Sequence, residues 1–160
     1  IDSKHILETV HFDGKETTIL PTNQLGLEET YYQKQPIDIQ PAPSDPSIKM
    51  PLGELFGARS GDKGGCANIG VWAKTENAYS FLNECLTVKK IKELMPDLAE
   101  FQIDRYELPN ILSLNFYIHG ILEDGVSSNT RKDGQAKSLG EYLRAKYIEI
   151  PKSLIKEKEA

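Results

Sequence analysis

The chain has 160 residues and a formal net charge of −5 at pH 7, with 39% hydrophobic and 27% charged residues. This length accommodates one domain with its own core plus a small extension, and the composition is that of a globular protein, which excludes collagenous and wholly disordered chains. The acidic balance disfavours bulk attraction to nucleic acid or anionic lipid, so we expect neither a nucleic acid nor a membrane as a partner. No apolar run approaches the roughly 20 residues of a membrane-spanning helix.

Only two cysteines occur, Cys66 and Cys85, and they are well separated in sequence. A disulfide framework is therefore not expected, and a reducing, cytoplasmic location fits better. The two cysteines and three histidines supply neither an iron–sulfur nor a zinc ligand set, so we expect no metal or other cofactor. The chain begins with Ile1, without a basic and apolar leader, which suggests a fragment of a longer protein.

The first 32 residues carry a hairpin pattern. The segments 5–12 and 17–20 flank Asp13-Gly14, a dipeptide typical of a two-residue turn. Two strands alone are marginally stable, so this extension is expected to lean on the main domain, on another copy of the chain, or on a preceding region. Residues 33–50 hold four of the nine prolines, which predicts an extended linker and a domain boundary near residue 50.

Residues 51–150 alternate strand and helix patterns. Strands are expected at 52–59, 67–74, 101–108, 112–118 and 148–150, and helices at 77–95, with a break near Thr87, and at 137–147. Helices on one face of a mostly antiparallel sheet make an α+β fold, and residues 67–150 follow the βαββαβ order of a ferredoxin-like sandwich, with one extra N-terminal strand. Residues 151–160 are expected to form a charged, frayed tail.

The segment 58–70, Ala-Arg-Ser-Gly-Asp-Lys-Gly-Gly-Cys-Ala-Asn-Ile-Gly, is the clearest functional signal. Its glycines let backbone N–H groups converge on a ligand, and Arg59 and Lys63 add positive charge, which predicts an anion-binding loop. The pattern matches neither a P-loop, because Asp62 separates Gly61 from the lysine, nor a dinucleotide fingerprint, because a strand follows it. A hairpin loop with merely solvated charges is the structural alternative.

Further polar residues extend this candidate site. Asn110 and Asn115 could orient the carbonyl or amide of a ligand, although an asparagine after a proline is also ordinary turn punctuation. Arg131 and Lys137 could extend a positive rim toward the glycine-rich segment. The predicted ligand-binding residues are Arg59, Ser60, Gly61, Asp62, Lys63, Gly64, Asn68, Asn110, Asn115 and Arg131.

Two side chains are candidate nucleophiles. Ser60 begins a Ser-x-x-Lys pattern, but the companion motifs of serine acylases are absent and the flanking glycines disfavour a helical turn. Cys66 follows two glycines near positive charge, which could make its thiol reactive, but no histidine is near it in sequence. A half-buried structural role is the favoured interpretation of Cys66, Cys85 is assigned to the core, and His119 is expected to be a partly exposed surface residue.

The chain resembles the C-terminal domain of the acyclic terpene utilisation protein AtuA family over about residues 52–150. The motifs that carry the resemblance, in order, are Ala58–Gly64, Asn68–Gly70, Arg105–Asn110, Leu114–Phe116, Gly120–Leu122, Gly125–Val126 and Asp133–Lys137. The resemblance implies a ferredoxin-like fold and, as partner, a large N-terminal AtuA domain in the same chain or a separate subunit. It also implies a link to the breakdown of acyclic terpenes such as citronellol and geraniol through acyl-CoA intermediates.

Three functions stay open on the sequence. The first is an accessory binding or oligomerisation domain whose glycine-rich segment takes an anionic, acyl-CoA-like ligand or a partner domain. The second is a catalytic module that acts on an acyl thioester through Ser60 or Cys66, although no base is evident beside either nucleophile. The third is a structural domain that forms homo-oligomers and binds no ligand.

Overall fold

The computed structural model describes residues 8–19 and 39–159 and divides the chain into two compact units, 1–36 and 37–160. In the first unit, β1 (Glu8–Phe12) pairs antiparallel with β2 (Lys15–Ile19). Asp13 and Gly14 have φ values of 48° and 70°, as the type I′ turn of an Asp-Gly hairpin requires. The rest of the predicted hairpin segment and residues 33–38 of the predicted linker lie outside the described residues.

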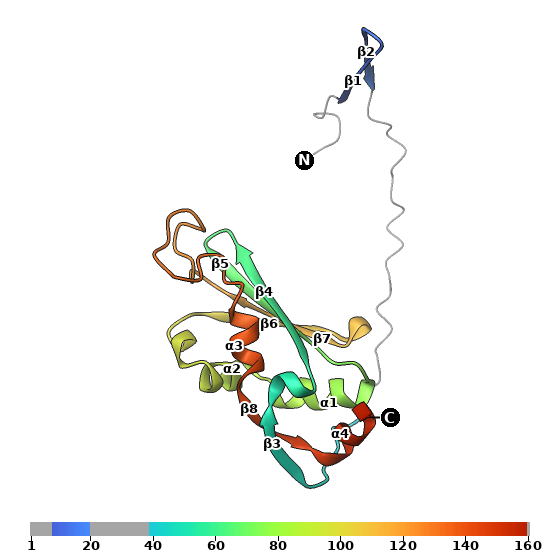
Figure 1. The fold of residues 1–160 in the computed structure, drawn as a ribbon, viewed down its shortest axis with the longest axis vertical. Helices are drawn as coiled ribbons and strands as arrows, with labels where there is room; N and C mark the ends of the chain where they lie inside the picture. Colours follow the sequence, from blue (N-terminus) through green and yellow to red (C-terminus); the bar gives the residue numbers. More distant parts are fainter. Residues whose placement is uncertain (1–7, 20–38, 160) are drawn as a thin grey trace. The chain divides into compact units, whose positions relative to one another are not determined.

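The second unit is built on a four-stranded antiparallel sheet (Figure 1). Its strands, in spatial order, are β4 (Gly57–Lys63), β5 (Cys66–Trp72), β7 (Ser113–Ile118) and β6 (Ile103–Leu108). Together with the helices, these strands confirm the predicted mixed fold with a ferredoxin-like domain. The alternation of apolar and polar residues in β7, which predicts a strand, arises because one face of this sheet is buried.

A separate two-stranded sheet pairs β3 (Ser47–Pro51) with β8 (Tyr147–Pro151). The predicted linker is therefore too long at its C-terminal end, since residues 47–50 belong to β3. The edge position beside β5 is occupied by β4, and β8 pairs with β3 instead. A two-residue turn joins β4 to β5, so their pairing requires little loop-closure entropy.

The helices begin where polar side chains meet free backbone N–H groups. Thr75 caps α1 (Glu76–Cys85) and Thr87 caps α2 (Val88–Leu94), which confirms the predicted break near Thr87. α3 (Leu139–Arg144) starts later than predicted because the Asp133 carboxylate accepts the preceding N–H groups of residues 137 and 138. Short 3-10 turns, η2 (Leu52–Glu54), η3 (Pro96–Leu98) and η4 (Pro109–Ile111), connect the elements.

The C-terminal segment differs from the frayed tail expected after Pro151. It forms α4 (Lys152–Glu159). Leu154 is only 1% exposed and packs in the core, which anchors this helix to the domain. None of the helices in the described ranges, 8–19 and 39–159, has the length and apolar character needed to cross a bilayer.

α1 and α3 lie on one face of the four-stranded sheet, which we call the covered face. Strand register puts Ile69 of β5, Phe116 of β7 and Arg105 of β6 in one row on this face. The Arg105 guanidinium donates hydrogen bonds to backbone carbonyls at the end of α1, and Ser60 of β4 bonds the backbone at α3. α1 and α3 therefore pack against the same side of the sheet, and the hydrophobic core lies between these helices and the sheet.

Candidate functional site: the open face of the sheet

The opposite side of the four-stranded sheet, which we call the open face, carries the residues that alternate with those of the core. They are Gly57, Arg59, Gly61 and Lys63 of β4, Cys66, Asn68, Gly70 and Trp72 of β5, Ser113, Asn115 and Tyr117 of β7, and Asp104, Tyr106 and Leu108 of β6. Most of these side chains are half-buried or exposed.

The predicted anion-binding loop is for the most part not a loop. Its residues form β4 and β5, and only Gly64 and Gly65 remain in the turn, where Gly64 has a φ of +64°. A Cβ on Gly65 would overlap the Glu123 carbonyl oxygen, and the Gly65 carbonyl accepts a hydrogen bond from Leu122 N–H at 2.9 Å. The turn therefore packs against residues 120–125 instead of projecting alone into solvent, as Figure 1 shows.

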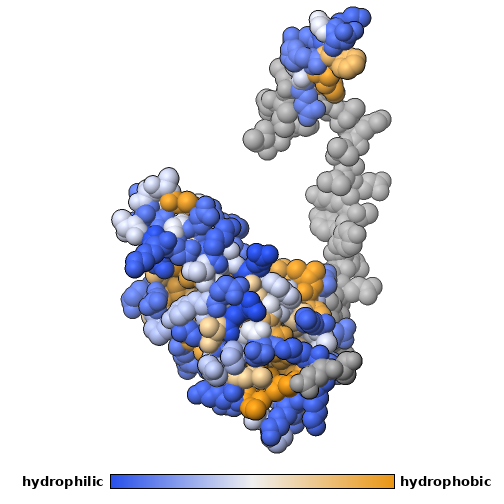
Figure 2. Space-filling view, in the orientation of Figure 1, coloured by the Kyte–Doolittle hydropathy of each residue, from blue (hydrophilic) through white to orange (hydrophobic). Residues whose placement is uncertain are grey.

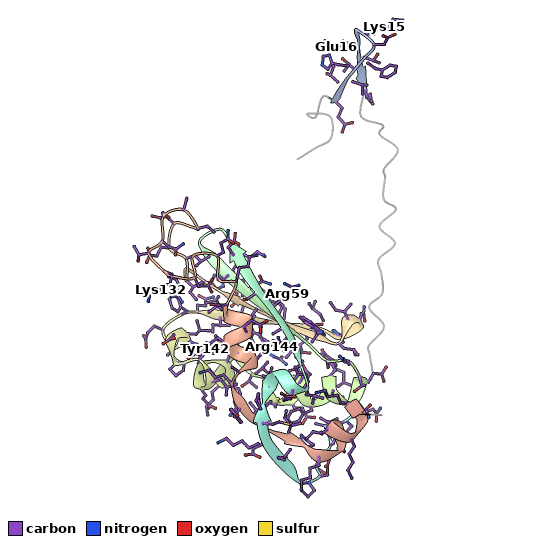
Figure 3. All side chains as sticks on the ribbon, viewed as in Figure 1. Lys15, Glu16, Arg59, Lys132, Tyr142 and Arg144 are labelled. Carbon is purple, nitrogen blue, oxygen red and sulfur yellow. The ribbon has the colours of Figure 1, made fainter. Side chains whose placement is uncertain are left out.

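Three cations line the β4 edge of the open face. Arg59 (labelled in Figure 3) and Lys63 both belong to β4, and the Lys63 ammonium donates to the Asp62 carbonyl at 2.9 Å. Lys137, from the segment before α3, reaches over Gly61, because its Nζ lies 3.2 Å from the position that a Cβ on this glycine would occupy. The glycine thus makes room for a third positive charge, which raises the positive potential along this edge.

An amide pair lies next to this edge. Asn68 Nδ2 donates to Asn115 Oδ1 across β5 and β7 at 2.9 Å, and both side chains are half-buried. This bond leaves the Asn68 carbonyl oxygen and the Asn115 NH2 group without a partner in the described part of the chain. One acceptor and one donor therefore face outward beside the cations.

The structure separates the other predicted ligand residues from this group. Ser60 and Asp62 alternate onto the covered face, where the Ser60 hydroxyl donates to Lys137 O at 3.0 Å and accepts from Gly140 N–H at 2.8 Å. Asn110 is exposed in η4, beyond the opposite edge strand β6.

Arg131 lies in the segment between β7 and α3. Burial alone would raise the pKa of Asp133, but the hydrogen bonds from Ser138 and Lys137, with a smaller contribution from the charge of Arg131, lower it overall. Among the described residues, no hydrogen bond or ion pair joins Arg131 to Arg59 or Lys63. The structure therefore brings Arg59, Gly61, Lys63, Asn68 and Asn115 together and leaves the remaining predicted residues elsewhere.

Sequence reasoning missed a cluster near the turn end of the open face. The register that pairs Ala67 with Ile118 puts Cys66 opposite His119, one position further along. His119 Nε2 lies 2.7 Å from an Asp104 carboxylate oxygen, and the Tyr117 ring meets the histidine edge-on at 4.9 Å between centroids. Only the strand register reveals this juxtaposition, although alternation along residues 112–119 already puts the tyrosine and the histidine on one face.

Hydrogen bonds within this cluster shift two pKa values. The hydrogen bond from His119 lowers the pKa of Asp104, and the hydrogen bond to Cys66 raises the pKa of Tyr117. Gly120 N–H also donates to the Cys66 sulfur at 3.4 Å. By contrast, burial raises the pKa of Cys85 to about 12, as a thiol packed against the core requires.

The described residues contain no group of three or more His, Cys, Asp or Glu side chains arranged to hold a metal ion.

The sequence model of one protein family, the AtuA ferredoxin-like domain, matches residues 50–149. No curated protein and no solved structure matches the chain. The matched segment includes all four strands of the large sheet and therefore the whole open face. Because the match spans more than half of the 160 residues, the chain belongs to the AtuA ferredoxin-like domain family.

Proposed function

We propose that this chain is an accessory binding domain of a larger AtuA-like protein and that its open face takes an anionic ligand of the acyl-CoA type. The observation that carries the proposal is the grouping of Arg59, Lys63 and Lys137 along one strand, beside the amide pair of Asn68 and Asn115. Phosphate groups are attracted by clustered cations, and an amide pair recognises carbonyl and amide groups such as those of a pantetheine arm.

The family resemblance gives this proposal its setting. AtuA-like proteins are linked to acyclic terpene breakdown, whose intermediates are acyl-CoA thioesters. In this setting the large N-terminal AtuA domain is the natural partner of the domain, and the open face would hold an acyl-CoA at the boundary with that partner. We propose a cytoplasmic location on the same grounds.

The test is the thermal stability of the chain with and without coenzyme A, acetyl-CoA and inorganic phosphate. Ligand bound to the native state raises the unfolding temperature in a concentration-dependent manner. Arg59→Glu together with Lys63→Glu should abolish the shift. The matched control, Lys152→Glu with Lys156→Glu on α4, should keep it. An unchanged shift in the first variant would remove the open face from consideration.

A purely structural role is the other outcome of this experiment. In this outcome light scattering finds a stable homo-oligomer, while neither coenzyme A nor phosphate shifts the unfolding temperature. In that case the domain assembles copies of itself or docks its partner without a small ligand. The double charge reversal then distinguishes which surface assembles, because it would change the oligomeric state only if the open face is buried.

A second candidate function is favoured by the position of Cys66 opposite His119, since a nucleophilic thiol requires a nearby base. In this reaction the histidine removes the thiol proton, and the sulfur attacks the carbonyl carbon of an acyl thioester. The thiol of the substrate leaves with that proton, and water then hydrolyses the acyl-cysteine. Asp104 would orient the histidine through its 2.7 Å hydrogen bond. Ser60 is a weaker candidate, because its hydroxyl already bonds two backbone groups.

Acetyl-CoA hydrolysis, followed by release of free thiol, tests this second function. Cys66→Ser and His119→Gln should each abolish turnover, whereas Cys85→Ser should not. Retained turnover in Cys66→Ser would exclude the thiol mechanism, and retained turnover in Ser60→Ala would exclude the serine.

A further inference from the structure

A pocket of about 350 Å³ lies at the end of β4 and β5 away from their turn. Its walls come from η2, the start of β4, the end of β5, the first turn of α1, the end of α3 and α4. This volume falls within the roughly 300–1,000 Å³ typical of small-molecule sites. Since a water molecule takes about 30 Å³, the pocket has room for about twelve groups of that size. Figure 2 shows larger hydrophobic patches toward this end of the unit than at the turn end.

Two glycines let the wall side chains lie flat against the backbone. A Cβ on Gly57 would overlap the indole ring of Trp72, which therefore packs directly on the β4 backbone. A Cβ on Gly53 would lie 2.9 Å from Arg144 Cβ and 3.0 Å from its Nε, so the arginine also needs a glycine beneath it. The walls thus depend on two close approaches that any larger residue would prevent.

The floor of the pocket is apolar and already ordered. Phe56 and Leu154 are each 1% exposed and Ala78 is 3% exposed. The Phe56 ring stacks with Phe81 at 6.3 Å between centroids and 15° between planes, which fixes its orientation. These three side chains are already covered, so the apolar surface that a ligand would bury comes mainly from Trp72, which is 38% exposed, and from half-buried Leu55, and the protein does not first have to be ordered.

Charged groups of both signs surround this floor: the cations Lys74, Arg144 and Lys158 and the carboxylates Glu54 and Glu157. Arg144 donates from Nη1 to Glu141, but its buried Nε has no hydrogen-bond partner in the described part of the chain. Lys74 is exposed at the rim and forms no ion pair with a described residue, whereas Lys158 already pairs with Glu54 at 3.6 Å. Nε itself is covered, but the Arg144 side chain is 38% exposed, so a ligand can approach the rest of its guanidinium.

We infer that this pocket binds a small amphipathic carboxylate, with an apolar body of medium chain length on the floor and its anionic end at Arg144 and Lys74. The carboxylate provides the acceptor that the guanidinium lacks, and the first turn of α1, capped by Thr75, adds the positive end of a helix dipole. This site lies apart from the cations of the open face and does not depend on the function proposed for them.

Trp72 is the single tryptophan of the chain and forms a pocket wall, so tryptophan emission, excited selectively over that of the seven tyrosines, responds to ligand at this wall. We expect octanoate, which has ten non-hydrogen atoms, to shift or quench the Trp72 emission of the full 160-residue chain in a saturable manner. Octanol, with the same body and no charge, should bind at least about tenfold more weakly, and inorganic phosphate should have no effect.

Paired variants separate the two features of the pocket. Arg144→Gln should weaken octanoate about tenfold or more and leave octanol unchanged. Gly57→Ala should displace the indole and abolish binding of both. Gly70→Ala, whose Cβ would meet only the Arg59 carbonyl oxygen at 3.9 Å, is the matched control on the same face and should bind normally.

Equal affinities for octanoate and octanol would overturn the inference, as would an emission that octanoate does not change. If Arg144→Gln fails to fold, Lys74→Gln, at an exposed position, makes the same test, with octanoate weakened and octanol unaffected. Arg59→Glu with Lys63→Glu should leave octanoate binding intact, so failure of the open-face proposal and failure of this one are distinguishable.

Discussion

On the covered face of the sheet, Ser60 and Arg105 direct their polar groups to the backbone of α3 and α1, whereas on the open face Asn68 and Asn115 bond each other. The covered groups satisfy backbone atoms that the helices would otherwise leave unpaired. On the open face, the Asn68 and Asn115 side chains bond only each other among the described residues. Polar residues of similar type thus have a structural role on one side of the sheet and are free to meet a ligand on the other.

Arg105→Met offers the largest expected contrast between the faces. The Arg105 side chain is 18% exposed, and its guanidinium donates to the Leu86 carbonyl and to both the backbone carbonyl and the side chain of Asn83. Its loss leaves these acceptors unsatisfied, and we expect the free energy of unfolding, measured in urea, to fall by about 3 kcal/mol. Arg59→Met on the open face should cost at most about 0.5 kcal/mol. Similar values for the two arginines would contradict the comparison.

Ser60→Ala is expected to have the next largest effect. The variant leaves the Gly140 N–H without its 2.8 Å acceptor at a buried position, so the free energy of unfolding should fall by about 2 kcal/mol. Ser113→Ala, on the open face, loses a single hydrogen bond to the Ile111 carbonyl, and its free energy of unfolding should fall by about 0.5 kcal/mol. If urea denaturation gives the reverse order, the assignment of the two faces is wrong.

Asn115→Ala should change stability little and binding more. It removes one half-buried hydrogen bond, worth about 1 kcal/mol, from the open face. The thermal shift with coenzyme A should nevertheless disappear if the amide pair contacts the ligand. If the thermal shift with coenzyme A stays as large as in the wild type, the cations alone recognise the ligand.

Asp104→Asn gives the smallest effect, and it depends on pH. Because the hydrogen bond from His119 lowers the folded pKa of Asp104 below its usual value of 3.8, the carboxylate adds stability above that pH. This contribution is lost as the pH falls through the folded pKa. The wild type should therefore have the higher urea midpoint at pH 6, and the difference from Asp104→Asn should vanish well below pH 3.8. A difference that grows toward acid would contradict the assigned bond.

Local patterns predicted the elements of this fold well. The Asp-Gly turn, the helix break at Thr87 and the alternation in β7 depend on residues near one another in sequence, and each is present. The pairing of β8 with β3 was not predictable in this way, because it joins segments about a hundred residues apart.

The candidate site was predicted in part. Arg59, Lys63, Asn68 and Asn115 were selected by residue type, and strand alternation explains why they share a face. Ser60 and Asp62 were selected with them from a presumed loop, but once the segment is a strand its odd and even residues point in opposite directions.

The amino-acid sequence by itself determined the class of fold, the family and the charged, glycine-rich strand pair, because these follow from composition, periodicity and motifs in order along the chain. Only the tertiary structure decided which side of the sheet each polar group faces, that His119 lies opposite Cys66, and that Trp72 and Arg144 enclose a pocket over two glycines. The reason is physical: strand register and the approach of side chains to distant backbone are set by packing between remote segments, which no local pattern encodes.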